Sequence, residues 1–399
     1  MCKINREHRS VQLFNYIFFT KIVQTFALSL FFTTFALNLL VIHITLKKLN
    51  IMEKTTITMK YIAREFGVSV ATVSRALAGS PHISKARREQ IQQFAREHNF
   101  YPNAIAAQLR QSHTTPSKII GVIVPQFAHY YFASILDGIE QESSARGYRI
   151  LVAQSDEQYN TEVQICESFY QNKVCGIIVS QAKDTTQYDH FRQLIDAGVP
   201  LVFYDRICAG INTSRVVVDD YMGAFNAVSH LIRTGCRRIA FFGTTMNIEI
   251  AKNRLNGYKD AIYQNGLTPD DSLIIQCDNR QDAELITPNI LKRKDRPDAF
   301  FAVNDETAIG ILYATKKFGL KVPQDISICG FTNVSSATAC SPMLTTVEQR
   351  GVEVGKEAAD ILIDFAEGKT PPEQVVKRIV KTRLVIRGTT RPLPEEPEK

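Results

Sequence analysis

From residue 118 onward the chain alternates short apolar runs with amphipathic stretches, and this pattern limits the possible folds more than any other feature. Runs of this length, rich in Val, Ile and Phe, are typical of buried strands in a parallel sheet whose connections are helices. The runs form two series: IIGVIV (119–124), RILVA (149–153), VCGIIV (174–179), PLVFY (200–204) and RVVV (215–218), then RIAFFG (238–243), LIIQ (273–276), AFFAV (299–303) and ISICGF (326–331). The sequence therefore predicts an α/β domain of two similar lobes with parallel sheets. A late helix over Gly351 to Glu367 and a closing strand over Lys377 to Arg387 complete it.

Ligands of such folds bind at the carboxyl ends of the strands, which places the expected binding site in the cleft between the lobes. No nucleophile with a nearby base and no pair of acids can be defended from spacing, so we predict no catalytic residue and no enzyme. The eight cysteines contain no C-x-x-C pair, so neither a metal site nor a redox motif is indicated. We expect no cofactor, and most of the thiols are expected to lie in the core.

Residues Thr58 to Leu77 read TMKYIAREFGVSVATVSRAL, which predicts two short helices joined by a tight turn, as in a helix-turn-helix. Thr58 and Ser69 are each placed to cap a helix, and Gly67 ends the first one because glycine tolerates a positive φ. The outward face of the second helix is small, hydroxylated and singly cationic, which fits the major groove of DNA. It consists of Val70, Ala71, Thr72, Ser74 and Arg75. The alternative is an ordinary helical hairpin with a solvated face.

A third helix is expected from a cap at Ser84 to about His98, with Lys85, Arg87 and Arg88 in its first turn. Positive charge at that end opposes the helix dipole. It therefore indicates either a nearby phosphate or a merely solvated run of charge.

Residues 101 to 110, YPNAIAAQLR, predict another helix, of only about eight residues, which would be unstable alone because nucleation costs more than so few hydrogen bonds return. Asn103 is its natural cap, and Ala106 belongs to a set of small residues that would let two copies approach closely. Leu109 is exposed unless it finds a slot, such as a minor-groove base step. The alternative is a linker helix packed on the next domain.

Charge is unevenly spread along the chain. Residues 53 to 118 carry ten Lys or Arg against four Asp or Glu, whereas the long remainder from 119 is near neutral. The basic excess coincides with the predicted helix-turn-helix, as binding to a polyanion requires.

Residues 1 to 51 form a hydrophobic extension. Ile22 to Leu46 is a stretch of 25 residues without a formal charge, long enough to span a bilayer. Two interpretations compete: a membrane anchor, or an upstream region translated by mistake, with Met52 as the true start. We favour the second, because Met52 lies just before the Thr58 cap. The protein is then cytoplasmic; the alternative is tethering to the inner membrane through residues 22 to 46.

In this order, a helix-turn-helix, a short alanine-rich helix and a two-lobed α/β domain resemble the LacI/GalR family of bacterial transcription regulators, over about residues 55 to 390. The motifs that carry the resemblance are ITMKYIAREFGVSVATVSRAL, YPNAIAAQLR, SKIIGVIVP, DAFFAVND, VPQDISICGF and LTTVEQ. The expected domains are 1–51, the extension; 52–100, the DNA-binding head; 101–117, the hinge helix and linker; 118–390, the effector-binding and dimerisation domain; and 391–399, a disordered tail.

The resemblance also implies roles for single residues. Bases would face Val70, Ala71 and Arg75, and phosphates would face Thr58, Ser69, Thr72 and Ser74. Asn103, Ala106 and Leu109 of the hinge helix would contact DNA, with Leu109 at the central minor-groove step. The positions that line the family's effector pocket are occupied by Tyr131, Phe132, Asp205, Arg254, Asn304 and Thr332. Many members carry Asp in place of Thr332, which leaves the identity of the effector open.

We therefore expect a DNA-binding regulator, a repressor of a carbohydrate-use operon, controlled by a small sugar-like effector. Its implied partners are double-stranded operator DNA and a second copy of itself, as a homodimer rather than a tetramer, since no terminal heptad-rich helix is present. A membrane-tethered or exported sugar-binding protein is the alternative, but it would have no use for residues 58 to 110. A sugar-processing enzyme is a second rival.

Overall fold

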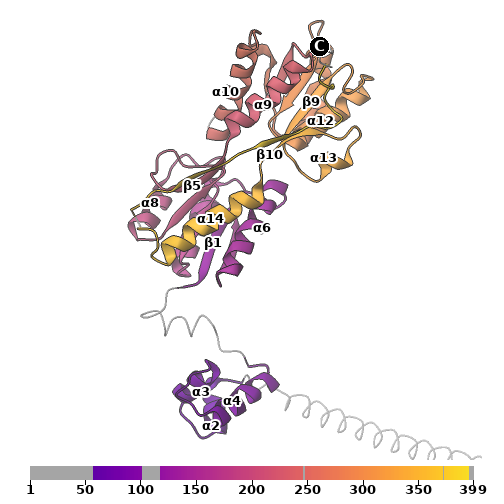
Figure 1. Cartoon of the computed structure of the whole chain (residues 1–399). Coiled ribbons are helices and arrows are strands. Elements are labelled where there is room, and N and C mark those ends of the chain that lie inside the picture. Colours follow the sequence, from indigo (N-terminus) through magenta and orange to yellow (C-terminus); the bar gives the residue numbers. More distant parts are fainter. Residues whose placement is uncertain (1–56, 101–116, 246–247, 372, 395–399) are drawn as a thin grey trace, which may run out of the picture. The chain divides into compact units, whose positions relative to one another are not determined.

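A computed structural model describes residues 57–100, 117–245, 248–371 and 373–394. The chain divides into two compact units, Met1–Gln111 and Ser112–Lys399 (Figure 1). The predicted extension over residues 1 to 51, the hinge helix with Asn103, Ala106 and Leu109, and most of the predicted tail lie outside the described residues. Within the described ranges, no helix is both long and apolar enough to cross a membrane.

The described part of the first unit consists of three helices, α2 (Met59–Glu65), α3 (Val70–Leu77) and α4 (Lys85–Glu97). The predicted caps form, since Thr58 Oγ1 accepts a hydrogen bond from the Tyr61 N–H at 3.2 Å and Ser69 Oγ accepts one from the Thr72 N–H at 3.1 Å. The three helices bury one small apolar core, which consists of Ile62, Ala63, Val73, Ala76, Ile91 and Ala95. A helix-turn-helix with a third supporting helix is therefore present.

The first turn of α4 differs from the expectation. Ser84 precedes the helix but its side chain makes no capping hydrogen bond. Arg87 Nη2 donates to the carbonyl of Phe66 at 2.6 Å, and Arg88 Nη1 lies 3.3 Å from the carbonyl of Ser80. Phe66 is the C-cap of α2 and Ser80 follows α3, so these arginines neutralise the negative ends of two neighbouring helices. Neither a phosphate nor simple solvation is needed to explain these two charges.

The second unit contains two six-stranded sheets. The first lobe has the strand order β11-β5-β4-β3-β1-β2, and all of its pairings are parallel. Its elements are β1 (Ile119–Val124), α6 (Tyr130–Ala145), β2 (Arg149–Gln154), α7 (Tyr159–Gln171), β3 (Gly176–Val179), α8 (Asp189–Asp196), β4 (Leu201–Tyr204), β5 (Ser214–Val218), α14 (Gly351–Ala366) and β11 (Lys377–Val380). All five strands predicted for this lobe from the apolar runs are present.

The second lobe repeats the plan with the order β12-β10-β9-β8-β6-β7, in which only the β10–β12 pairing is antiparallel among the described strands. Its elements are α9 (Asp220–Arg233), β6 (Ile239–Gly243), α10 (Glu249–Gln264), η1 (Asp271–Leu273), β7 (Ile274–Gln276), α11 (Arg280–Leu291), β8 (Ala299–Ala302), α12 (Asp305–Lys317), β9 (Ser327–Thr332), α13 (Ser336–Ala339), β10 (Thr345–Glu348) and β12 (Arg383–Val385). The four predicted strands of this lobe are also present.

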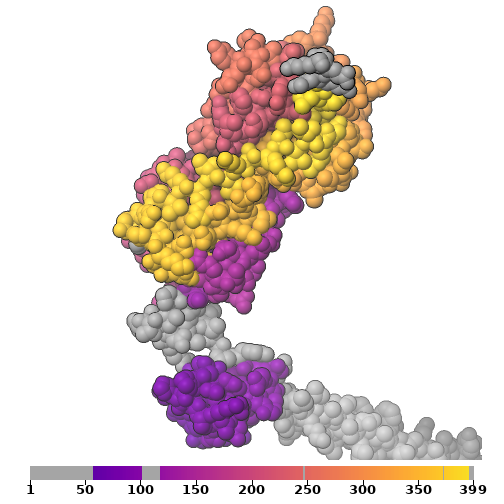
Figure 2. All heavy atoms as spheres, viewed as in Figure 1, coloured from indigo at the N-terminus to yellow at the C-terminus, as the bar shows by residue number. Residues whose placement is uncertain are grey.

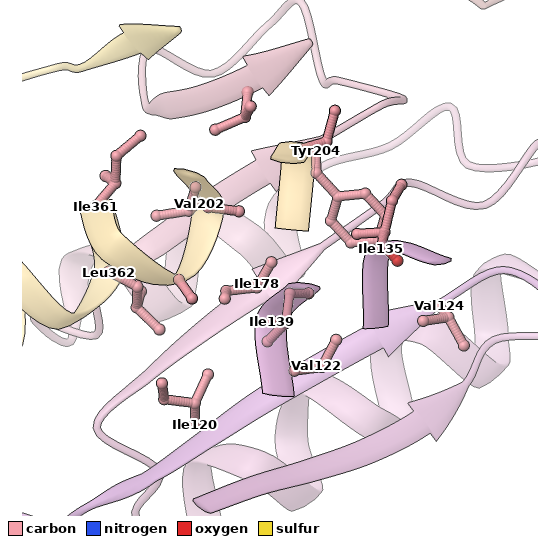
Figure 3. Packing of buried hydrophobic residues seen from close by; sticks show 14 of the residues in the cluster. Ile120, Val122, Val124, Ile135, Ile139, Ile178, Val202, Tyr204, Ile361 and Leu362 are labelled. Atoms are coloured by element: carbon pink, nitrogen blue, oxygen red, sulfur yellow. The ribbon is translucent and has the colours of Figure 1, made fainter. Parts of the chain in front are cut away.

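Helices α6 and α14 cover one face of the first sheet (Figure 1) and pack closely on each other. A Cβ atom at Gly138 would lie 2.0 Å from the carbonyl oxygen of Val352, and one at Gly355 would lie 2.1 Å from that of Ile135. The two backbones can approach this closely only because glycine has no side chain. Figure 3 shows apolar side chains of the two helices and of the first sheet packing together in the core between them.

The predicted single strand over Lys377 to Arg387 is wrong. The segment forms two strands, β11 in the first sheet and β12 in the second. In the described residues the chain thus passes between the lobes three times: between β5 and α9, between β10 and α14, and between β11 and β12. Figure 2 shows the yellow C-terminal part of the chain lying over both lobes.

Candidate functional site

A cavity of about 560 Å³ lies between the two lobes. It is lined by residues that follow the carboxyl ends of strands from both sheets, as parallel α/β folds require of a binding site. All six residues predicted to bind an effector line this one cavity: Tyr131, Phe132, Asp205, Arg254, Asn304 and Thr332. The structure brings them together from α6, from α10 and from the ends of β4, β8 and β9.

Arg254 is held firmly at the wall of the cleft. Its Nε donates to Asp220 Oδ1 at 2.8 Å, Nη2 lies 2.7 Å from the same oxygen, and Nη1 donates to the carbonyl of Val303 at 2.6 Å. The guanidinium also stacks over the ring of Phe331, 3.8 Å from its centroid. Burial raises the pKa of Asp220 to about 6, and the charge of Arg254 opposes that rise. An effector can therefore take only the N–H groups left on Nη1 and Nη2.

Asp205 directly follows β4 with a left-handed φ of 58°. Its carboxylate is buried, and Oδ2 lies 3.9 Å from Arg206 Nε. Burial raises the pKa of Asp205, while the guanidinium groups of Arg206 and Arg254 lower it. Within the described residues, Oδ1 of this desolvated carboxylate has no hydrogen-bond partner, so it is available as an acceptor.

Several buried polar atoms around the cavity have no hydrogen-bond partner within the described residues. They are His129 Nδ1, Tyr131 Oη, Asp205 Oδ1, Arg206 Nε and Gln349 Nε2. Buried polar groups in proteins are nearly always satisfied, so a cluster of five unsatisfied atoms around one cavity indicates a ligand or ordered water that bonds to them. Donors and an acceptor are both present in this set.

The other predicted cleft residues are less available. Asn304 caps α12: its Oδ1 accepts from the Thr307 N–H at 2.8 Å, and its Nδ2 donates to the carbonyl of Asp278 at 2.8 Å. Phe132 is buried, and the guanidinium of Arg206 lies over its ring at 5.5 Å from the centroid. Arg206 therefore already covers part of the apolar surface that Phe132 could offer to a ligand.

Sequence reasoning missed several charged residues of the cleft, among them Glu157, Lys183, Arg206 and Asp278. Each lies within a few residues of the carboxyl end of a predicted strand. The rule that ligands bind at these ends could have found them. Glu157 and Arg206 pair within the first lobe, whereas the pairing of Lys183 with Asp278 depends on the contact between the lobes.

The predicted DNA-binding face of α3 is only partly free. Ala71 and Arg75 are exposed, whereas Val70, Thr72 and Ser74 are half-buried, and Val70 packs against the small core of the head. The Ser69 and Thr72 hydroxyls lie 2.9 Å apart. Among the described residues, Arg75 takes part in no ion pair, so its guanidinium is available to an external partner.

A helix-turn-helix head followed by a two-lobed domain with a polar cleft defines a ligand-responsive DNA-binding regulator. Residues 58–103 match the bacterial regulatory proteins of the lacI family, and residues 228–390 match the periplasmic binding protein-like domain. The chain belongs to the lacI family, whose members are regulators of transcription and not enzymes.

Curated relatives match more than four fifths of this chain over nearly their own full length. Catabolite control protein A of Priestia megaterium is 30% identical over 338 residues, 84% of this chain and 99% of the relative. The transcriptional repressor CytR of Escherichia coli K12 is 30% identical over 345 residues, 86% of this chain and 98% of the relative.

Solved structures agree with the fold. The complex of the transcriptional regulator CelR with cellobiose is 26% identical with a TM-score of 0.64, and it covers 84% of this chain and 99% of its own. A lac repressor dimer bound to operator and an anti-inducer has a TM-score of 0.73 at 23% identity and the same coverage, a likeness that shows the fold alone.

Proposed function

We propose that this regulator represses a carbohydrate-use operon and is released from, or fixed on, its operator by an uncharged sugar bound between the lobes. The cluster of unsatisfied buried polar atoms in the cleft carries the proposal. Sugar hydroxyls both donate and accept hydrogen bonds, so one sugar can satisfy the acceptor of Asp205 and the donors of Arg206 and Gln349 together. Solved relatives hold cellobiose and, in Enterococcus faecium, ribose, which supports this class of ligand.

The charges around the cleft favour an uncharged ligand. Each of the four cations that line the cavity already faces a carboxylate: Arg254 with Asp220, Arg206 with Glu157 at 2.6 Å, Lys183 with Asp278 at 2.9 Å, and Arg280 with Glu284 at 2.8 Å. Asp205 contributes a further negative charge. A phosphorylated sugar would then enter a site without a surplus of positive charge, and desolvating its phosphate would cost more than the site returns.

Calorimetry tests the ligand class. We expect heat of binding with one or more neutral mono- or disaccharides, and none with their phosphates. Asp205→Asn keeps the shape of the side chain but removes its charge, so it should weaken sugar binding by tenfold or more, about 1.4 kcal/mol or above for a hydrogen bond to a charged group. If a purine or an amino acid binds tightly and no sugar binds, the proposal of a sugar effector is wrong.

For DNA we propose that Val70, Ala71 and Arg75 contact bases, and that Thr58, Ser69, Thr72 and Ser74 contact phosphates. The exposure of Ala71 and Arg75 supports this. The half-burial of Val70 and the bond between Ser69 and Thr72 limit how far those three side chains can reach. The proposed contacts of Asn103, Ala106 and Leu109 rest on the sequence. Selection of bound genomic fragments, with and without sugars, tests the operator and the sign of regulation together.

We propose a cytoplasmic homodimer. An operator with two similar halves calls for two heads, and a solved relative is a dimer on its operator. Mass measurement in solution should give twice the chain mass; a stable monomer would contradict the proposal.

A further inference from the structure

Among the described residues, an ion pair between Lys183 and Asp278 joins the two lobes across the cleft. Lys183 lies in the loop after β3 of the first lobe, and Asp278 follows β7 of the second. Lys183 Nζ is 2.9 Å from Asp278 Oδ2, and Thr244 Oγ1 donates to the same oxygen at 2.5 Å. Both side chains are about one third exposed, 35% for Lys183 and 27% for Asp278. The pair therefore lies at the edge of the cavity, partly shielded from water.

The loop that carries Lys183 is held in place by hydrogen bonds to the buried carboxylate of Glu162. Glu162 is fully buried and accepts hydrogen bonds from the Ala182 N–H and from the Thr185 hydroxyl, each at 2.8 Å, and His190 Nε2 lies 3.1 Å from it. A charge buried this completely is stable only with several such partners. The backbone around Lys183 is consequently held in one place before any contact with the second lobe forms.

A second anchor acts on the lysine itself. The Lys183 N–H donates to Glu157 Oε2 at 2.9 Å, and Arg206 Nη1 donates to the same oxygen at 2.6 Å. Partial burial alone would raise the pKa of Asp278, but the hydrogen bond from Thr244 and the charge of Lys183 bring it below its ordinary value. The carboxylate of Asp278 is therefore negatively charged at neutral pH.

We propose that Lys183 and Asp278 form an inter-lobe clasp that favours the closed cleft and so determines which ligands enter it and how firmly they are held. In the described residues the chain also crosses between the lobes three times, and crossings of this kind act as hinges between packed lobes. A contact between side chains on the two sides of the cleft biases the hinge towards closure because it exists only in the closed state. A ligand that is too large for the closed cavity, or that draws Asp278 away from Lys183, must break this ion pair and should therefore bind more weakly.

A double-mutant cycle on the full chain tests the clasp without any ligand. Fluorophores attached through noncanonical amino acids at the exposed positions Asp196, in the first lobe, and Tyr263, in the second, report lobe separation by single-molecule energy transfer. Lys183→Met and Asp278→Asn should each increase the ratio of open to closed molecules roughly two- to fivefold, as expected for a partly exposed ion pair. The double variant should open no further than the more open single variant, because the second change removes a partner already lost.

Lys259→Met is the matched control. Lys259 pairs with Asp271 at 2.9 Å within the second lobe, so its loss removes the same charge without touching the contact between lobes. Single variants that behave like this control, or effects that simply add in the double variant, would overturn the clasp. Since no sugar is present in the measurement, the result does not depend on the proposed effector.

Discussion

Arg254, which we propose as an effector-binding residue, also has a structural role in the wall of the cleft. Removing its side chain would leave Asp220 buried without its partner, and breaking a buried ion pair in this way typically costs about 3 to 5 kcal/mol. We expect Arg254→Ala to lower the free energy of unfolding by about that amount, as measured by denaturant titration. Arg254→Ala with Asp220→Ala should restore part of the loss. If the single variant unfolds like the parent, Arg254 is not the anchor of this wall.

His129 should make the protein more sensitive to acid. Burial, helped by the charges of Arg206, Lys183 and Arg254, lowers the pKa of His129 to about 4, against 6.5 for the free side chain. The unfolded chain therefore binds a proton between these values and the folded one does not, so the stability from His129 is complete above pH 6.5 and is lost as the pH falls towards 4. When the pH falls from 7 to 5, the free energy of unfolding of the His129→Asn variant should drop by about 1 to 2 kcal/mol less than that of the parent, as measured by denaturant titration at each pH. Equal losses in both proteins would contradict the assignment.

On DNA, Arg75→Ala and Leu109→Ala should fail differently. Loss of a base contact typically costs about 1 to 3 kcal/mol, confined to one position of the site. Loss of a minor-groove wedge should instead weaken binding at the operator centre and reduce bending, while salt-sensitive binding to random DNA persists. Affinity and bending measured on operator and random duplexes distinguish the two. Equal losses on both duplexes would show that neither residue acts as proposed.

For single residues, the sequence predicts which side chains line the cavity better than it predicts which of their polar atoms are free to bind a ligand. The six residues that the family resemblance implies for the effector pocket line one cavity, but Arg254 and Asn304 are already hydrogen-bonded to other protein groups. Asp220, which claims most of Arg254, lies 34 positions away in the chain. Only the fold brings such partners together, so no local pattern could reveal the pairing.

Among the elements, the strands that apolar runs predict are those buried by hydrophobicity. Strand β10 was not predicted because it begins with two threonines, Thr345 and Thr346, that are buried through hydrogen bonds. The Thr345 N–H donates to Thr389 Oγ1 at 2.8 Å, and Thr346 Oγ1 donates to Asp305 Oδ1 at 2.5 Å. A buried polar strand of this kind is stable only if the fold supplies hydrogen-bond partners for its side chains and backbone. The split of 377–387 into β11 and β12 is hidden for a similar reason, because a change of sheet leaves no mark on apolar periodicity.

The contact between α6 and α14 gives a prediction for a pair of elements. Gly355→Ala adds a methyl group where the Ile135 carbonyl oxygen would be 2.1 Å away, so the helices must separate. Overpacking of this kind typically costs about 1 to 3 kcal/mol, and α14 should lose part of its contact with the first sheet. Thermal unfolding measures the loss. Ser144→Ala, on the exposed face of α6, is the control and should change stability by less than about 0.5 kcal/mol.

For the whole molecule, regulation requires that an event in the cleft change the affinity of the head for DNA. A ligand can do this only if the open and closed lobes differ in their coupling to operator binding. The clasp allows that coupling to be tested before the effector is known, because Lys183→Met alters closure without any ligand. Lys183 belongs to the second unit and is far from the head in sequence, so its loss removes no proposed DNA contact.

If lobe closure and operator binding are coupled, Lys183→Met and Asp278→Asn should shift operator affinity in the same direction. Each shift can be no larger than the change in the ratio of open to closed lobes, roughly two- to fivefold, because linkage cannot exceed the free energy that drives it. Binding of a selected genomic fragment, followed by fluorescence anisotropy at constant salt, gives the measurement. Lys259→Met should leave the affinity unchanged. Variants that open the lobes yet bind the fragment as the parent does would show that the signal from the cleft to the head depends on something other than closure.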